Sequence, residues 1–141
     1  MKTKVEDLTD AELDRLVGKV VKGWELDDST SVWTSKDPDE SLCWYAPCAY
    51  VRSDAWWQPS ENPAQFFLVD KPSEWLFDFY ELMEPEDHRV LAIDIRKAKW
   101  FGDLIASVCL PLDPANKTAA YCRGRCIVAL KACGVTEVDD D

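Results

Sequence analysis

Residues 89–110 constrain the fold of this chain most strongly. Aliphatic side chains occupy alternate positions between Arg89 and Lys97, with small or charged residues between them. This period of two is typical of a strand with one buried face. A Gly-Asp turn then precedes a second apolar run at 104–110. The pattern therefore predicts two antiparallel strands that pair as a hairpin.

The two ends of the chain have helical spacing. Thr9 and Glu12 are placed as in a capping box, ahead of an apolar stripe that stops at Gly23. A second helix is predicted over 117–133, with Gly134 as its stop. Its apolar face consists of Ala119, Cys122, Cys126, Ala129, Leu130 and Cys133. We expect both helices to pack on the sheet through their stripes.

Gly124 lies opposite this cysteine stripe on the helical wheel. A glycine inside a helix costs about 1 kcal/mol relative to alanine. In a two-layer fold it cannot serve helix–sheet packing from that side. We interpret it as a place where a partner, a second subunit or another segment approaches closely, with neutral drift as the alternative.

The middle of the chain carries three weaker patterns. An aromatic run at 42–51 predicts a strand. Ser60 is the expected N-cap of a helix with Pro63 in its first turn. Apolar residues after Ser73 recur at helical spacing and predict a third helix, which ends near residue 84.

These elements predict an α+β fold. We expect one domain over 1–134, an antiparallel sheet of about four strands flanked by helices, that is, an α/β sandwich. The remaining residues, 135–141, form an acidic tail that we expect to be frayed.

The charge is distributed very unevenly. Residues 89–134 hold eight Lys/Arg and three Asp/Glu, a net of +5, and the rest holds eight and twenty-four, a net of −16, which sums to −11. This balance argues against direct binding of nucleic acid or of anionic membranes, because both require cations. It favours a partner protein with a basic surface. Since neither a signal peptide nor a membrane-spanning run is found, we expect a cytoplasmic protein.

Metal, phosphate and nucleophilic sites have little support in the sequence. Cys122 and Cys126 lie on one helical stripe, which favours packing over zinc or redox chemistry. The five glycines form no phosphate-binding loop. The only histidine, His88, lies in a charged segment. We therefore predict no catalytic residues, no metal, no cofactor and no enzymatic activity.

Three segments carry a resemblance to a known family: Leu16–Trp24 (LVGKVVKGW), Gln58–Val69 (QPSENPAQFFLV) and Thr118–Lys131 (TAAYCRGRCIVALK). In their order and spacing they resemble phage ABA-sandwich domain proteins. The resemblance implies a small phage-encoded accessory protein with a sheet flanked by helices and no catalytic residues. It also implies an inhibitor of a host enzyme or of host defence, which acts in the host cytoplasm.

The preferred hypothesis is a protein-binding inhibitor that docks on a basic host protein and masks a nucleic-acid site. Its candidate partner-binding residues are Trp44, Trp56, Trp57 and Trp75, because tryptophan is enriched at binding hot spots. A core position is the alternative for at least two of these rings.

The alternative hypothesis is a sponge-like protein that binds a nucleotide or another small ligand. Its candidate residues are Arg96, Lys99, Trp100 and Arg125, which combine cations with an indole. The same cations could instead neutralise acidic neighbours on the first and third helices. A carboxylate hydrolase and a passive homodimer also remain open.

Overall fold

The computed structural model of the chain describes residues 2–27, 29, 31–34, 51–53, 56–71, 73–84, 88–98 and 102–139. The elements in these residues are β1 (Lys2–Lys4), a 3-10 turn (Val5–Asp7), α1 (Asp10–Leu16), a π-helical turn (Val17–Val21), β2 (Glu25–Asp27), β3 (Val32–Thr34), β4 (Val51–Ser53), a 3-10 helix (Pro63–Leu68), β5 (Trp75–Glu84), β6 (His88–Lys97), β7 (Leu104–Pro111), α2 (Lys117–Ala132) and β8 (Glu137–Asp139).

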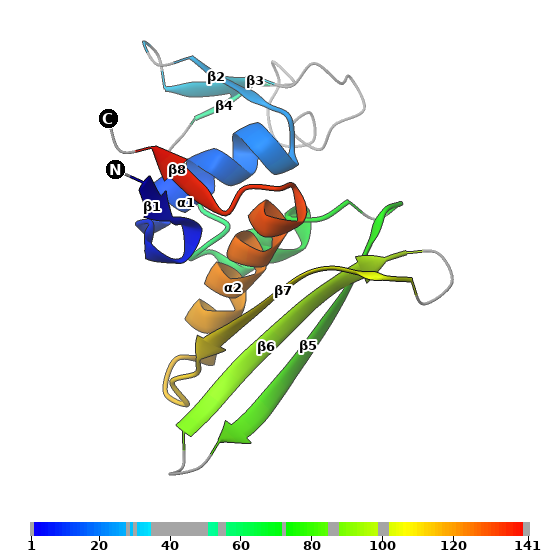
Figure 1. The fold of residues 1–141 in the computed structure, drawn as a ribbon. Helices are drawn as coiled ribbons and strands as arrows, with labels where there is room; N and C mark the ends of the chain where they lie inside the picture. The colour runs from blue at the N-terminus through cyan, green and yellow to red at the C-terminus, as the bar shows by residue number, and fades with distance from the viewer. Residues whose placement is uncertain are drawn as a thin grey trace.

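Helices and antiparallel sheets together confirm the α+β class. Within the described residues the strands form three sheets, ordered β5-β6-β7, β2-β3-β4 and β1-β8. The expected single sheet of about four strands is therefore replaced by smaller ones. Figure 1 shows α1 and α2 between the sheet β2-β3-β4 and the sheet β5-β6-β7. The predicted strand at 42–51 lies outside the described residues except for Val51, which belongs to β4.

The hairpin predicted from residues 89–110 is confirmed. β6 and β7 pair antiparallel, with Leu91 opposite Leu110 and Ile93 opposite Val108. Leu91 and Ile93 are fully buried, as the alternation requires. The odd-numbered residues of β6 thus face the core, and the even-numbered residues face the outer side of the sheet.

The segment after Ser73 is a strand, and the predicted helix is wrong. Residues Trp75–Glu84 pair with His88–Lys97 of β6 over ten positions. Trp75, Phe77 and Phe79 alternate, and aromatic side chains fit a half-buried pleated surface well. The same residues also satisfy helical spacing, so pairing with β6, which is a non-local interaction, decides between the two structures.

The first helix begins as predicted. The Glu12 backbone N–H donates to the Thr9 hydroxyl over 3.2 Å, and the Thr9 N–H donates to the Glu12 carboxylate over 3.3 Å. The last turn widens into a π-helical turn, and Gly23 ends it with a φ of +71°. Trp24 then folds back into the core, where it is 2% exposed.

α2 is buried on two sides, and it meets the sheet β5-β6-β7 through a face other than the predicted cysteine stripe. A Cβ on Gly124 would lie 2.6 Å from Cδ1 of Ile93, so this position faces the sheet. The α2 helix also contacts α1, and the π-helical turn that continues α1 contacts β2 and lies against Trp33 of β3. The predicted first helix therefore packs on the sheet β2-β3-β4. Of the alternatives for Gly124, the close approach of another segment is confirmed, because side chains of β6 and β7 lie against it. The expectation that Gly124 cannot serve helix–sheet packing is wrong, because α2 meets the sheet through this face.

The 3-10 helix Pro63–Leu68 is shorter than the helix predicted there, and its N-cap is Asn62 in place of Ser60. The Ser60 N–H donates instead to the buried carboxylate of Asp14 over 2.8 Å. The Trp57 indole N–H donates to the Asp14 carbonyl over 2.8 Å. These two bonds fix the segment before the 3-10 helix on α1.

Three residues of the acidic tail, Glu137–Asp139, lie in a strand. These residues form β8, which pairs antiparallel with β1. Lys2 lies opposite Asp139, and Lys4 lies opposite Glu137. Opposite charges across strands stabilise such a pair.

Candidate functional site

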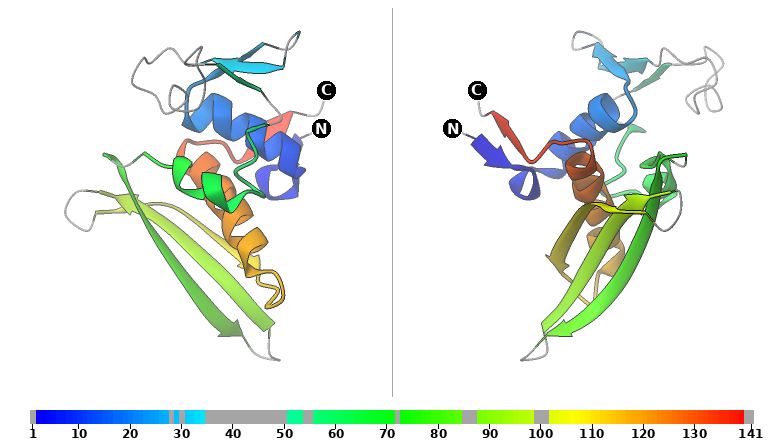
Figure 2. Two further views of the ribbon diagram at one scale, coloured as in Figure 1. Left: turned by 180° about the vertical axis from the view of Figure 1, so that it is seen from behind. Right: turned by 45° about the vertical axis from the view of Figure 1, so that its right-hand side comes forward.

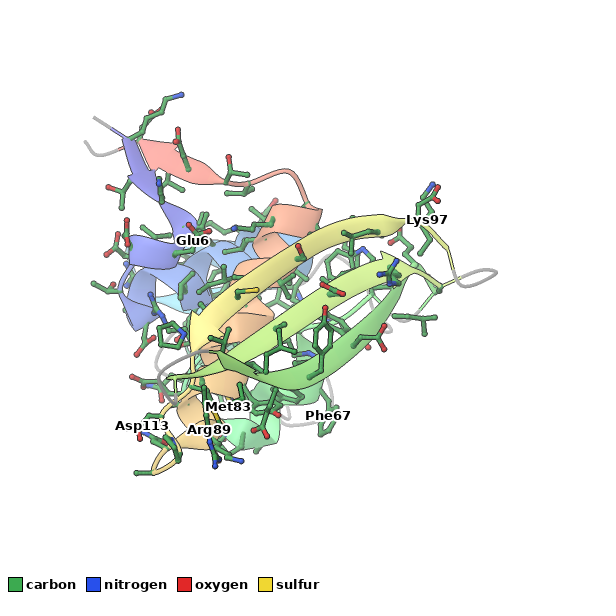
Figure 3. All side chains as sticks on the ribbon, turned by 60° about the horizontal axis from the view of Figure 1, so that its bottom comes forward. Glu6, Phe67, Met83, Arg89, Lys97 and Asp113 are labelled. Atoms are coloured by element: carbon green, nitrogen blue, oxygen red, sulfur yellow. The ribbon has the colours of Figure 1, made fainter. Side chains whose placement is uncertain are left out.

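Exposed large apolar side chains gather on and beside β5. In the part of the chain that the structure describes, the exposed ones are Phe67, Leu76, Tyr80, Leu82, Met83 and Leu104. Four of these six belong to β5. We call Leu76, Tyr80, Leu82, Met83 and Phe67 the β5 surface. Phe67 is 76% exposed and Met83 is 60% exposed, and Figure 3 shows both on the β5 side of the sheet.

The outer face of the sheet β5-β6-β7 lacks a covering layer of described elements. Figure 2 shows α2 on one face and no drawn helix or strand on the other. Leu76, Tyr80 and Leu82 project to that uncovered face, because side chains alternate along a strand. Such gatherings of apolar side chains on a folded domain mark interaction sites more often than singly scattered ones.

Tyr80 is held in place on this outer face, midway along the edge strand β5. Its hydroxyl donates to the carboxylate of the buried Asp94 over 2.7 Å. That hydrogen bond raises the pKa of Tyr80. Arg96 lies 3.8 Å from the Asp94 carboxylate and 4.0 Å from that of Asp78. The ring is therefore preorganised, which lowers the entropic cost of using it as an anchor.

Arg125 fixes the inner side of β5. The side chain is 4% exposed, and its Cζ lies 4.4 Å from the Phe66 ring centroid and 3.9 Å from that of Phe77. Its Nε–H donates to the Val69 carbonyl over 2.8 Å, and Nη2 lies 3.7 Å from the Asp70 carboxylate. Burial lowers the pKa of Arg125, and Asp70 opposes that effect. These contacts join the 3-10 helix, and with it Phe67, to β5.

Two of the predicted partner-binding tryptophans belong to the core. Trp57 is 1% exposed and Trp75 is 6% exposed. Trp56 is partly buried against Trp57, at 5.7 Å between ring centroids. Trp44 lies outside the described residues. The core alternative is confirmed for Trp57 and Trp75, so neither ring is placed to reach a partner.

The structure describes two of the predicted small-ligand residues, Arg96 and Arg125, and places them on opposite sides of the sheet β5-β6-β7. Arg125 is buried inside the fold, and Arg96 is at the outer face beside two carboxylates. Lys99 and Trp100 lie outside the described residues. Other basic side chains form ion pairs, as the neutralising alternative expected: Lys117 with Glu81 at 3.0 Å, Arg123 with Asp10 at 2.7 Å and Lys131 with Glu6 at 2.6 Å.

A polar pocket lies at the N-terminus of α2. Its volume is about 370 Å³, and its lining is Asp10, Ser60, Glu61, Asn116, Thr118, Ala119 and Arg123. Arg123 donates to Asp10 and also to the carbonyls of Glu6 and Leu8, over 3.0 and 2.6 Å. A hydrogen bond to Asp10 raises the pKa of Glu61. Because Arg123 and Asp10 already tie α2 to the N-terminal segment, we assign this pocket a structural role.

The described residues contain no group of three His, Cys, Asp or Glu side chains that could hold a metal ion. Cys122 and Cys126 are buried free thiols, and burial raises the pKa of both. Cys43, Cys48 and the side chain of His88 lie outside the described residues. The absence of a cofactor and of enzymatic activity stays a prediction.

Comparisons with protein-family models, with curated proteins and with solved structures each find no match to this chain. The resemblance to phage ABA-sandwich domain proteins accordingly stays a proposal. None of the helices in the described ranges is long and apolar enough to cross a lipid bilayer.

The members of the β5 surface were missed in the sequence for an identifiable reason. The helical spacing predicted after Ser73 places Leu76, Leu82 and Met83 on one apolar side together with Trp75. In a strand, successive side chains point to opposite faces, so Leu76, Tyr80 and Leu82 lie on the face opposite Trp75 and Phe77. This alternation is the sequence signal that could have identified the β5 surface.

Proposed function

We propose that this chain acts by binding another protein through the β5 surface. One observation carries the proposal: most of the exposed large apolar side chains in the described residues lie on one strand or pack beside it. That strand is braced on its inner side by Arg125 and on its outer face by the bond between Tyr80 and Asp94. Rigid aromatic and aliphatic side chains of this kind are what interface anchors require.

Charge favours a basic partner. The chain has a net charge of −11, and the carboxylate of Asp78 on the outer face is 63% exposed. An apolar patch surrounded by Lys and Arg on the partner would complement this surface. The acidic field would accelerate association, while the apolar anchors would slow dissociation.

The resemblance to phage ABA-sandwich domain proteins supports a narrower proposal. It suggests a phage-type accessory protein that inhibits a host protein in the host cytoplasm. A host protein with a basic, nucleic-acid-binding surface would fit both the resemblance and the charge. The β5 surface replaces the tryptophans as the proposed site of contact.

Leu82 and Leu104 provide a matched pair of variants for the test. They are 43% and 49% exposed on opposite edge strands of one sheet. Wild type, Leu82→Asp and Leu104→Asp are immobilised, and proteins retained from a host lysate are compared by quantitative mass spectrometry and then titrated singly. We expect Leu82→Asp to weaken a specific partner by about 2 kcal/mol or more, and Leu104→Asp by less than about 0.5 kcal/mol. Equal effects of the two variants, or binding indifferent to salt, would refute the proposal.

A further inference from the structure

We propose that the partner supplies an extended basic segment that adds as a fourth strand to the free edge of β5. This inference rests on the proposed function and specifies how the β5 surface is used. In the part of the chain that the structure describes, β5 pairs only with β6, so its other edge carries no strand. An unpaired edge is a template for main-chain hydrogen bonding by a second chain.

In an antiparallel pair, alternate residues of a strand direct their backbone N–H and C=O groups toward the neighbouring strand, and the residues between them direct these groups away from it. One hydrogen bond is enough to show which residues of β5 face the free edge. The Ala98 N–H donates to the Glu74 carbonyl over 2.9 Å, so residue 74 directs its carbonyl toward β6. Because the phase alternates along an antiparallel ladder, even-numbered residues of β5 bond to β6. The odd-numbered residues point their N–H and C=O groups the other way. The Trp75 N–H confirms this phase, because it donates to the Lys71 carbonyl outside the sheet over 2.8 Å.

Four consecutive odd positions remain available beyond Trp75. They are Phe77, Phe79, Glu81 and Met83, and all four lie within the ten-residue pairing with β6. An added strand could therefore form a ladder along most of β5.

Apolar side chains on both faces would receive the side chains of an added strand. Leu76, Tyr80 and Leu82 stand along the outer face. On the inner side, a groove of about 280 Å³ is lined by Pro63, Phe66, Phe67, Lys117, Thr118, Tyr121 and Cys122. The ring of Phe66 lies 5.5 Å from that of Phe79, which places this groove beside β5. Main-chain bonds would supply affinity, and these two surfaces would select alternate side chains.

Charge selects a basic segment over a second copy of this chain. Residues 74–84 contain four acids, Glu74, Asp78, Glu81 and Glu84, and no Lys or Arg. Three of these acids belong to β5, so pairing two copies of β5 edge to edge would place six carboxylates on neighbouring strands, where like charges are destabilising. Arg96 and Lys117 of this chain lie beside Asp78 and Glu81. The acids at the two ends of the segment, together with the net charge of −11, would attract Lys or Arg side chains interspersed with apolar residues in the added strand.

Amide exchange in the full-length protein tests the pairing directly. Hydrogen–deuterium exchange is followed by NMR for each β5 amide, with and without the peptide acetyl-Lys-Val-Lys-Leu-Lys-Val-Lys-amide. We expect the amides of Phe77, Phe79, Glu81 and Met83 to exchange at least ten-fold more slowly with saturating peptide. The even-numbered amides, which already bond to β6, should change little.

Two control peptides test whether main-chain pairing and positive charge cause the amide protection. A version with N-methyl groups on two adjacent central residues cannot pair on either edge, and a version with Glu in place of Lys reverses the charge. Both should lose the alternating protection. The inference is overturned if the odd-numbered amides gain no protection, or if the N-methylated or Glu peptide protects them equally well.

The failures of the two proposals are distinguishable. If the lysine peptide perturbs Tyr80 and Leu82 without alternating amide protection, binding through the β5 surface stands and strand addition is wrong. If Leu82→Asp and Leu104→Asp retain the same partners equally, the β5 surface itself is wrong, whatever the peptide does.

Discussion

Replacing Asp14 by asparagine should make the protein more stable above pH 6. Asp14 is 4% exposed, and its carboxylate accepts the Ser60 N–H over 2.8 Å. Burial raises the pKa of Asp14 from 3.8 to about 6, hydrogen bonds from Ser60 oppose this rise, and the neighbouring acids Asp10 and Glu61 add to it. The folded protein therefore holds a proton that the unfolded chain releases near pH 4.

The direction and size of the change in stability follow from the difference between the pKa of Asp14 in the folded protein and in the unfolded chain. A raised pKa means that the contribution of Asp14 to stability is complete below about pH 4 and is lost as the pH rises through about 6. At about 1.4 kcal/mol per pKa unit, the loss amounts to about 3 kcal/mol. Asparagine keeps an oxygen that can accept the Ser60 N–H and carries no charge at any pH. Asp14→Asn should thus equal the wild type near pH 4 and exceed it by up to about 3 kcal/mol at pH 8.

The assay is urea unfolding followed by tryptophan fluorescence at several pH values between 4 and 8. Asp103→Asn is the control, because Asp103 is exposed and its substitution changes the net charge by the same amount. A stability gain for Asp14→Asn that is constant across this pH range, or that Asp103→Asn reproduces, would refute the assignment of the effect to burial.

Two further substitutions test the packing that supports the site. A Cβ on Gly18 would lie 2.8 Å from the ring of the fully buried Trp33, so Gly18→Ala should lower the free energy of unfolding by about 1–3 kcal/mol; unchanged stability in urea unfolding would contradict this. Arg125→Met should lower it by about 1–3 kcal/mol, because the Val69 carbonyl loses a buried donor, and should loosen Phe66 from Phe77. Unchanged NMR shifts of both rings would show that Arg125 does not brace β5.

Local sequence patterns were sufficient to predict three elements of the fold. The capping box at Thr9 and the glycine at Gly23 define the first helix, and alternation between Arg89 and Lys97 defines β6. Residues 117–133 were assigned to a helix with nearly correct ends. In each of these segments, one periodicity and its stop signals agree, so no distant contact is needed to choose the structure.

The structure of β5, the position of Gly124 and the β5 surface depend on packing between segments that are distant in the sequence. Residues 75–84 satisfy both periods, and only their pairing with β6 makes them a strand. The position of Gly124 against the sheet could not be deduced, because the wheel does not reveal that α2 has partners on two sides. The β5 surface depends on both facts. Helical spacing therefore places its exposed side chains on a helix, and the enrichment of tryptophan at interfaces points to Trp57 and Trp75, which fill the core.

The position of α2 has a consequence for synthesis on the ribosome. This helix is the shared middle of the fold, yet it is translated after α1 and after the strands β5, β6 and β7 that it covers. Until it emerges, the N-terminal helix and the long hairpin each lack the surface on which they bury their apolar side chains. Nascent chains that stall before residue 117 should therefore stay open to proteases and chaperones, and the complete core should form only once residues 117–132 have left the exit tunnel.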